Sequence, residues 1–72
     1  MKSKMFNYNM LKKRIKEKNM KFSEVAKALK LNAGTFSIKI NNGSYFTQDE
    51  IYVMLHLLDI PQQDIKQYFF TI

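Results

Sequence analysis

The chain has no cysteine and only one histidine, and each of these shortages excludes a class of protein. Without cysteine there is neither a disulfide framework nor a thiolate metal site, and His56 alone cannot build a zinc site. The longest apolar runs are a few residues, too short for a membrane span or a signal-peptide core. We therefore expect a single cytoplasmic domain over residues 1–72, with no metal, no other cofactor and no small-molecule ligand.

Negative charge is also scarce, and its scarcity is confined to the first half of the chain. Residues 1–40 hold eleven Lys and Arg against two Glu, a net charge of +9 (11 − 2). Residues 41–72 hold one Lys against four carboxylates, a net charge of −3 (1 − 4). A basic half joined to an acidic half suits a domain with one side facing a polyanion. The plainer alternative is a helix made soluble by its lysines, and charge alone does not decide between them.

Apolar residues recur at helical spacing, and no segment shows the period-two alternation of a strand. Asn7 or Asn9 is the expected cap of a first helix that runs to about Lys18, with residues 1–6 as a frayed start. Its apolar face consists of Tyr8, Leu11 and Ile15. The second helix is expected to begin at Ser23 or one or two residues earlier and to close at Lys30. Its apolar face consists of Phe22, Val25, Ala26 and Leu29.

Three further helices follow the first two. Asn32 is the expected cap of a helix from Ala33 to about Asn41, and Asn41-Asn42-Gly43 is a stop signal. Thr47 and Glu50 form a capping box for the fourth helix, and Phe46 with Ile51 form a hydrophobic staple around it. The apolar residues of these two helices are Phe36, Ile40, Ile51, Met54, Leu55 and Leu58. Pro61 suits the start of a fifth helix, Gln62 to about Phe69, with Ile65 and Phe69 on one face.

Residues 20–43 have the arrangement of a helix-turn-helix, formed by the second and third helices. Ala26 supplies the small residue that is needed where the two helices cross, and Leu31 supplies an apolar plug for the turn. Phe36 and Ile40 bury one narrow stripe of the third helix. Its opposite face therefore stays free.

The stretch FSEVAKALKLNAGTFS from Phe22 to Ser37, followed by Asn41-Asn42-Gly43, resembles the phage Cro and repressor type (XRE-like, lambda-repressor-like) helix-turn-helix family. The later Phe46-Thr47-x-x-Glu50-Ile51, ending in Tyr68-Phe69-Phe70, is similar to a branch of short phage regulators. The resemblance covers roughly residues 10–70. It implies a compact all-α domain of five helices that binds double-stranded DNA and regulates transcription in the cytoplasm of a bacterial host.

The resemblance also assigns individual positions. The residues that match positions facing base edges are Ala33, Gly34, Thr35, Ser37 and Ile38. The residues that match phosphate contacts, or lie beside them, are Lys21, Phe22, Ser23, Lys39, Asn41, Asn42 and Ser44. The chain departs from the family at several points: Lys21-Phe22 replace a polar pair such as Thr-Gln, and Lys30 stands where glycine is usual. The third helix has one extra residue, which puts Lys39 where relatives have an inward aliphatic side chain.

The base-facing residues are small and largely apolar, whereas base discrimination usually relies on Arg, Gln or Asn. Ala33, Ile38 and the methyl group of Thr35 can touch thymine methyls, and Thr35 and Ser37 can make single hydrogen bonds. Gly34 either permits close approach to DNA or is a neutral surface residue. Ile38 is expected to be exposed, the alternative being a place in the core. We expect backbone charge and DNA shape to supply much of the affinity.

The chain ends in an aromatic tail, with Tyr68, Phe69, Phe70 and Ile72 as candidate contacts of a homodimer on DNA. The alternative is that these four residues cap the core of a monomer. A second function on the same fold is a protein-interaction module, such as an anti-repressor or regulator-binding protein. Membrane-surface binding is disfavoured because lysines surround the first helix. No enzyme is expected, since the sequence has no nucleophile–base pair, phosphate loop or metal set.

Overall fold

The computed structural model describes residues 5–72, and within them every regular element is helical. The α-helices are α1 (Asn9–Glu17), α2 (Phe22–Ala28), α3 (Ala33–Ile40), α4 (Gln48–Leu57) and α5 (Ile65–Phe69), with a 3₁₀ helix η1 (Gln62–Asp64) before α5. The predicted five-helix, all-α class is confirmed. Of the predicted frayed start at residues 1–6, residues 1–4 lie outside the described part of the chain, and the prediction is wrong for Phe6, because its backbone N–H and carbonyl are both bonded to Asn42.

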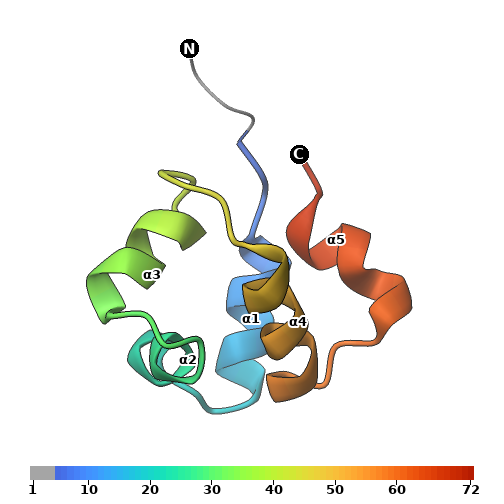
Figure 1. The fold of residues 1–72 in the computed structure, drawn as a ribbon. Coiled ribbons are helices and arrows are strands. Elements are labelled where there is room, and N and C mark those ends of the chain that lie inside the picture. Colours follow the sequence, from blue (N-terminus) through green and yellow to red (C-terminus); the bar gives the residue numbers. More distant parts are fainter. Residues whose placement is uncertain (1–4) are drawn as a thin grey trace.

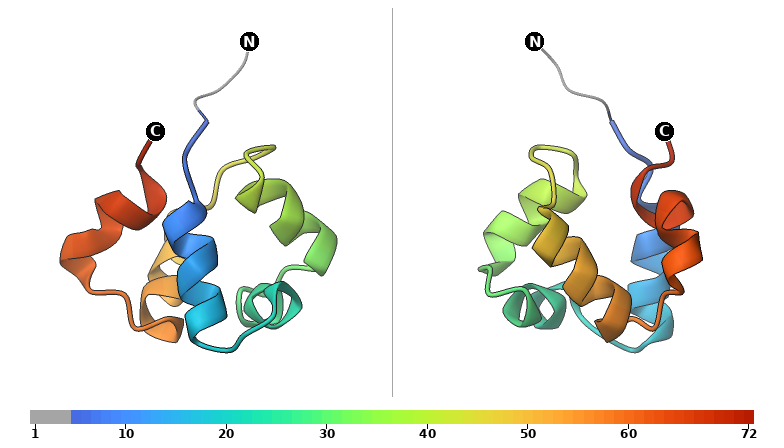
Figure 2. Two further views of the ribbon diagram at one scale, coloured as in Figure 1. Left: turned by 180° about the vertical axis from the view of Figure 1, so that it is seen from behind. Right: turned by 45° about the vertical axis from the view of Figure 1, so that its right-hand side comes forward.

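The helices form two flanks around a central pair (Figure 1). Helices α2 and α3 lie on one side, α5 lies on the other, and α1 and α4 stand between them, as the views from behind and from the side also show (Figure 2). The backbone N–H of Asn7 donates to the carbonyl of Thr71, so the segment before α1 is tied to the C-terminal tail.

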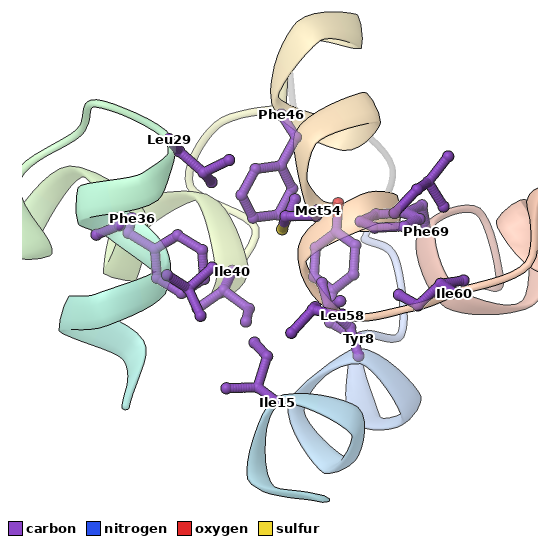
Figure 3. Packing of buried hydrophobic residues seen from close by; sticks show 14 residues of the cluster. Tyr8, Ile15, Leu29, Phe36, Ile40, Phe46, Met54, Leu58, Ile60 and Phe69 are labelled. Atoms are coloured by element: carbon purple, nitrogen blue, oxygen red, sulfur yellow. The ribbon is translucent and has the colours of Figure 1, made fainter. Parts of the chain in front are cut away.

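The hydrophobic core is made by all five α-helices (Figure 3). Leu11 and Ile15 from α1, Phe36 from α3 and Met54 from α4 are each at most 1% exposed. Leu58, just after α4, is as deeply buried. Burying a side chain of this size stabilises the fold by about 1.5–3 kcal/mol. The predicted inward residues that are buried are Tyr8, Leu11, Ile15, Val25, Ala26, Leu29, Phe36, Ile40, Met54, Leu55, Leu58 and Phe69.

Side chains cap the N-termini of α3 and α4 as predicted. The Oδ1 of Asn32 accepts the N–H of Thr35 at 2.7 Å. In α4 the Oγ1 of Thr47 accepts the N–H of Glu50 at 3.1 Å, and the Glu50 carboxylate accepts the N–H of Thr47 at 2.9 Å. Because each bond satisfies a backbone donor that the helix leaves unpaired, these two boundaries are fixed locally.

The start of α2 differs from the expected cap at Ser23. Its N-cap is Lys21, whose backbone N–H donates to the carboxylate of Glu24 at 2.7 Å, and Ser23 lies within the helix. The prediction of a start one or two residues earlier is the correct one. The predicted cap of the first helix at Asn7 or Asn9 is wrong, because the N-cap of α1 is Tyr8, Asn9 is already helical, and the Oδ1 of Asn7 accepts the N–H of Asn9.

The fifth predicted helix is divided in two. Residues Gln62–Asp64 form the 3₁₀ helix η1, and only Ile65–Phe69 are α-helical. A tight turn of this kind is common where an α-helix begins. Pro61, with φ of −60°, immediately precedes η1, as its fixed backbone angle favours.

The first four helices all end in the same way, on a non-glycine residue in the left-handed conformation. These residues are Asn19, Lys30, Asn42 and Asp59, with φ of 57°, 61°, 69° and 53°. In each case the next N–H donates to the carbonyl five residues back, at 2.7–3.1 Å: Met20 to Ile15, Leu31 to Ala26, Gly43 to Ile38 and Ile60 to Leu55. This is the Schellman motif. The left-handed residue after α3 is Asn42, while Gly43 has no positive φ.

Lys30 is the least suited of these four residues, because its side chain has no local means of stabilising positive φ. Lys30→Gly should therefore raise the free energy of unfolding by roughly 0.5–1 kcal/mol, even after the entropic cost of glycine. Lys27→Gly is the matched control, since it removes the same exposed charge from the interior of α2 and should destabilise by about 1 kcal/mol. Urea unfolding followed by circular dichroism measures both, and a loss of stability in both variants would contradict the assignment.

Candidate nucleic-acid interface

Helices α2 and α3 pack closely through small and aromatic side chains. Ala26 and Phe36 are both almost completely buried, and the ring of Phe22 meets that of Phe36 in an edge-on contact with centroids 5.5 Å apart. Leu31, in the turn between the helices, is half-buried against the core, as predicted for the plug. The small side chain of Ala26 lets the helices approach, and the turn plug fixes the position of α3 relative to α2.

The predicted base-facing residues all lie on α3, and the residues of this helix that enter the core are different ones, Phe36 and Ile40. Ala33, Gly34, Ser37 and Ile38 are exposed, and Thr35 is half-buried. Ile38 is 55% exposed, so the expectation that it stays outside the core is confirmed. The structure thus brings the five residues together on α3, outside the hydrophobic core, and leaves a shallow surface without long charged side chains.

Lys39 does not lie on this surface, which corrects its prediction as a phosphate contact. The residue is 9% exposed, and its Nζ donates to both carboxylate oxygens of Glu50, at 2.7 and 2.9 Å. The physical reason is helical spacing: position 39 comes three residues after the buried Phe36 and so lies on the same inward side of α3. A buried ammonium needs a charged partner, and α4 supplies one.

Glu50 therefore serves two elements at once. Its Oε1 accepts from both the Thr47 backbone and the Lys39 ammonium, so the cap of α4 is also the point where α3 is attached. Burial raises the pKa of this carboxyl, but the hydrogen bonds from Lys39 and Thr47 outweigh burial, and the net pKa of Glu50 is lowered from its ordinary 4.5. The fold thus stabilises the charged form of the Glu50 carboxyl.

The loop after α3 is partly occupied by contacts within the protein. The amide of Asn42 donates to the Phe6 carbonyl at 2.8 Å and accepts the Phe6 N–H at 2.7 Å. Both ends of the Asn42 amide are therefore bonded within the protein, and its role as a phosphate contact stays a prediction. Asn41 is exposed but its Nδ2 donates to the Ser37 carbonyl at 2.8 Å, and Ser44 is exposed.

Two further cations of the basic half bind the end of α4. The Nε of Arg14 donates to the Leu58 carbonyl at 2.8 Å, and its Nη2 donates to the Asp59 carbonyl at 2.7 Å. Lys18 pairs with the carboxylate of Asp59, which lowers the pKa of that exposed carboxyl. Cations beside the last carbonyls of a helix are favourable for the helix dipole. Sequence reasoning missed these contacts, since the partners are over forty residues apart.

Five lysines of the basic half remain exposed and have no ion-pair partner among residues 5–72: Lys13, Lys16, Lys21, Lys27 and Lys30. Lys21 and Ser23 lie together at the start of α2, where phosphate contacts were predicted, and both are exposed. Phe22 between them is 40% exposed and packs on Phe36. Its role is therefore mainly to join α2 to α3.

The aromatic tail is divided between core and surface. Phe69 is 1% exposed, so its prediction as a dimer contact is wrong, because it closes the core over α1 and α4. Tyr68 is half-buried, whereas Phe70 and Ile72 are 47% and 76% exposed. Phe70 lines an apolar depression together with Phe6, Tyr8, Tyr45, Phe46, Gln48, Ile51 and Phe69.

Other classes of site find no support in the described residues. His56 is exposed and its ring lies 4.6 Å from that of Tyr52. Within residues 5–72 no three His, Asp or Glu side chains gather in a way that would hold a metal ion. Over the same residues, every helix is too short or too polar to cross a membrane.

The Glu50 contacts predict an acid-sensitive fold. Glu50→Gln keeps a capping side chain but removes the charge, and should lower the free energy of unfolding at neutral pH by about 2 kcal/mol, the scale of a hydrogen bond to a charged group. Because the folded pKa is lowered, this contribution is complete above pH 4.5 and is lost as the pH falls through the folded pKa. The difference between wild type and variant should therefore shrink in acid.

Urea unfolding of wild type and Glu50→Gln, at neutral pH and well below pH 4.5, measures the difference in their free energies of unfolding. Asp49→Asn is the matched control, since it removes the same charge from the exposed neighbouring position. A constant difference between wild type and Glu50→Gln at all pH values would show that the ion pair does not hold α3.

A family model described as "Protein of unknown function (DUF739)" matches residues 4–72 of the chain. No curated protein matches it. The family match spans nearly the whole sequence, including all five α-helices and the turn between α2 and α3. The chain is therefore a member of the DUF739 family.

Proposed function

We propose that this protein is a DNA-binding transcriptional regulator of the Cro and repressor type, which inserts α3 into the major groove of double-stranded DNA. The observation that carries the proposal is the exposed outer face of α3, formed by Ala33, Gly34, Ser37 and Ile38 on a helix whose other side is held by the core. The major groove admits an α-helix. Ala33, Gly34 and Ser37 are small, which allows the helix backbone to approach the base edges closely.

The free lysines support the same proposal. A duplex presents two rows of phosphates beside the groove, and each neutralised phosphate releases counterions. Lys21 at the start of α2, together with Lys27 and Lys30 on and after that helix, lies on the element that directly precedes α3. Arg14, Lys18 and Lys39 are used within the fold and are not assigned to phosphates. The phosphate contacts are thus concentrated on α2.

Binding should be strongly dependent on salt, because backbone charge supplies most of the affinity. Lys21→Gln should weaken binding to all duplex sequences alike and reduce the slope of log Kd against log salt by about one, the effect of losing one phosphate contact. Lys66→Gln is the control, since Lys66 is exposed but lies in the acidic half. Fluorescence anisotropy over a salt series measures both slopes. A salt-insensitive Kd would contradict this mechanism.

Selection of binding sites from random duplex DNA distinguishes this function from its main alternative. Groove reading predicts that wild type enriches one palindromic site and that the triple variant Thr35→Ala, Ser37→Ala, Ile38→Ala does not. If wild type enriches no sequence even at low salt, the protein-interaction function replaces the regulator. The exposed aromatic depression around Phe70 would then be the first surface to test.

We also propose that two copies bind together on DNA, with recognition helices spaced by one turn of the duplex, about 34 Å. The exposed apolar side chains of Phe70 and Ile72 are the candidate contact. Phe70→Asp should then yield a monomer in sedimentation on DNA, whereas wild type binds as a dimer. Val53→Asp is the control. It places the same charge on a partly exposed apolar residue of α4, away from Phe70 in the sequence, and should leave the dimer intact. A wild type that is monomeric both free and on DNA would exclude the dimer.

A further inference from the structure

The outer face of α3 has no long polar side chain that is free to read a base. Bidentate recognition requires the whole amide of Asn or Gln, a guanidinium or an ammonium group. The residues of this kind on and beside α3 are Asn32, Lys39, Asn41 and Asn42, and each is already bonded within the protein. Lys39 and Asn42 are fully used.

Each of the two exposed asparagines uses one atom of its amide in the fold. Asn32 uses its oxygen to cap α3 through the Thr35 N–H, at 2.7 Å. Asn41 uses its nitrogen on the Ser37 carbonyl, at 2.8 Å. An asparagine reads adenine through its oxygen and nitrogen together, so each residue would have to share an amide atom that already makes a bond of the fold.

Ile38 is the one large side chain on the outer face, and it rests on the backbone of Gly43. The N–H of Gly43 donates to the Ile38 carbonyl at 2.7 Å. A Cβ at position 43 would lie only 2.7 Å from the Cγ2 of Ile38, so only glycine leaves room for this contact. One methyl of Ile38 is therefore supported by the loop after α3, while the side chain as a whole stays 55% exposed.

This support makes Ile38 a rigid apolar probe. β-branched side chains in helices have one strongly preferred χ1 rotamer, and the contact with Gly43 supports that limit from outside the helix. Little conformational entropy is then lost when the side chain is covered by a ligand. An exposed, prearranged apolar group on a surface proposed to enter the major groove needs an apolar partner there.

We propose that Ile38 is a specificity-determining residue that contacts the 5-methyl group of thymine. This inference rests on the proposed DNA-binding function. Thymine is the natural base that presents a methyl group in the major groove, whereas cytosine and adenine present amino donors there. Next to Ile38 such a donor would lose its water without gaining an acceptor. The exposed methyl side chain of Ala33 and the methyl group of Thr35 extend the same apolar surface along α3.

The test replaces thymine by deoxyuridine, one position at a time, in the duplex that wild type selects from random DNA. Deoxyuridine keeps the base pair and its O4 acceptor and lacks only the methyl group. At one position in each half-site, the replacement should weaken wild-type binding about fourfold, the effect of losing one buried methyl group. Ile38→Ala should weaken binding to the thymine duplex and show no further loss with deoxyuridine at that position.

Ser37→Ala is the matched control, since it changes a neighbouring exposed residue of the same helix and should keep the full deoxyuridine effect. The proposal is overturned if no position responds to deoxyuridine, or if Ile38→Ala and deoxyuridine weaken binding independently, so that their effects multiply. Both outcomes leave DNA binding itself intact. Failure of the wild type to bind any duplex at low salt would instead overturn the proposed function.

Discussion

The two bonds from the Lys39 ammonium to the Glu50 carboxylate hold the outer helix α3 to the centre of the fold. Glu50 is at the same time the reciprocal partner in the Thr47 cap, so the start of α4 and the position of α3 depend on one carboxylate. A pair this poorly exposed is costly to form and more costly to break from one side. It attaches α3 to α4, beside the apolar packing of Phe36 and Ile40 in the core.

Several cations of the basic half are bound within the fold, so the basic composition does not measure the charge that is free for a partner. The first half carries +9, yet Arg14, Lys18 and Lys39 serve the fold itself, two at the carboxyl end of α4 and one at its start. Helix α4 is thus gripped at both ends by cations from elsewhere in the chain. The charge available to a partner is therefore smaller than the sequence total, and among residues 5–72 its unpaired lysines lie on and beside α1 and α2.

The features that sequence predicted well are those set by residues within one or two helical turns. The caps at Asn32 and Thr47 follow from spacing alone, and so do the apolar faces of the first four helices, apart from the exposed Phe22. The outward position of Ile38 follows from its place opposite Phe36 and Ile40. The errors involve partners distant in sequence. Nothing local to Asn42 indicates that it will bond Phe6, and nothing local to Lys39 names Glu50 as its partner. Such pairs depend on how helices pack, which propensity and periodicity do not encode.

Repeated use of one helix ending also bears on how the chain folds. Asn19, Lys30, Asn42 and Asp59 each reverse the backbone within a six-residue motif, so every change of direction from α1 to α4 is specified locally. A chain whose reversals are local loses little loop-closure entropy before its helices meet, and such topologies belong to the fast-folding class. The positive φ at these four residues is then the energetic cost of turns that set the direction of the chain locally. A short sequence with little core gains most from this arrangement, because its helices meet before long-range contacts have to select among alternatives.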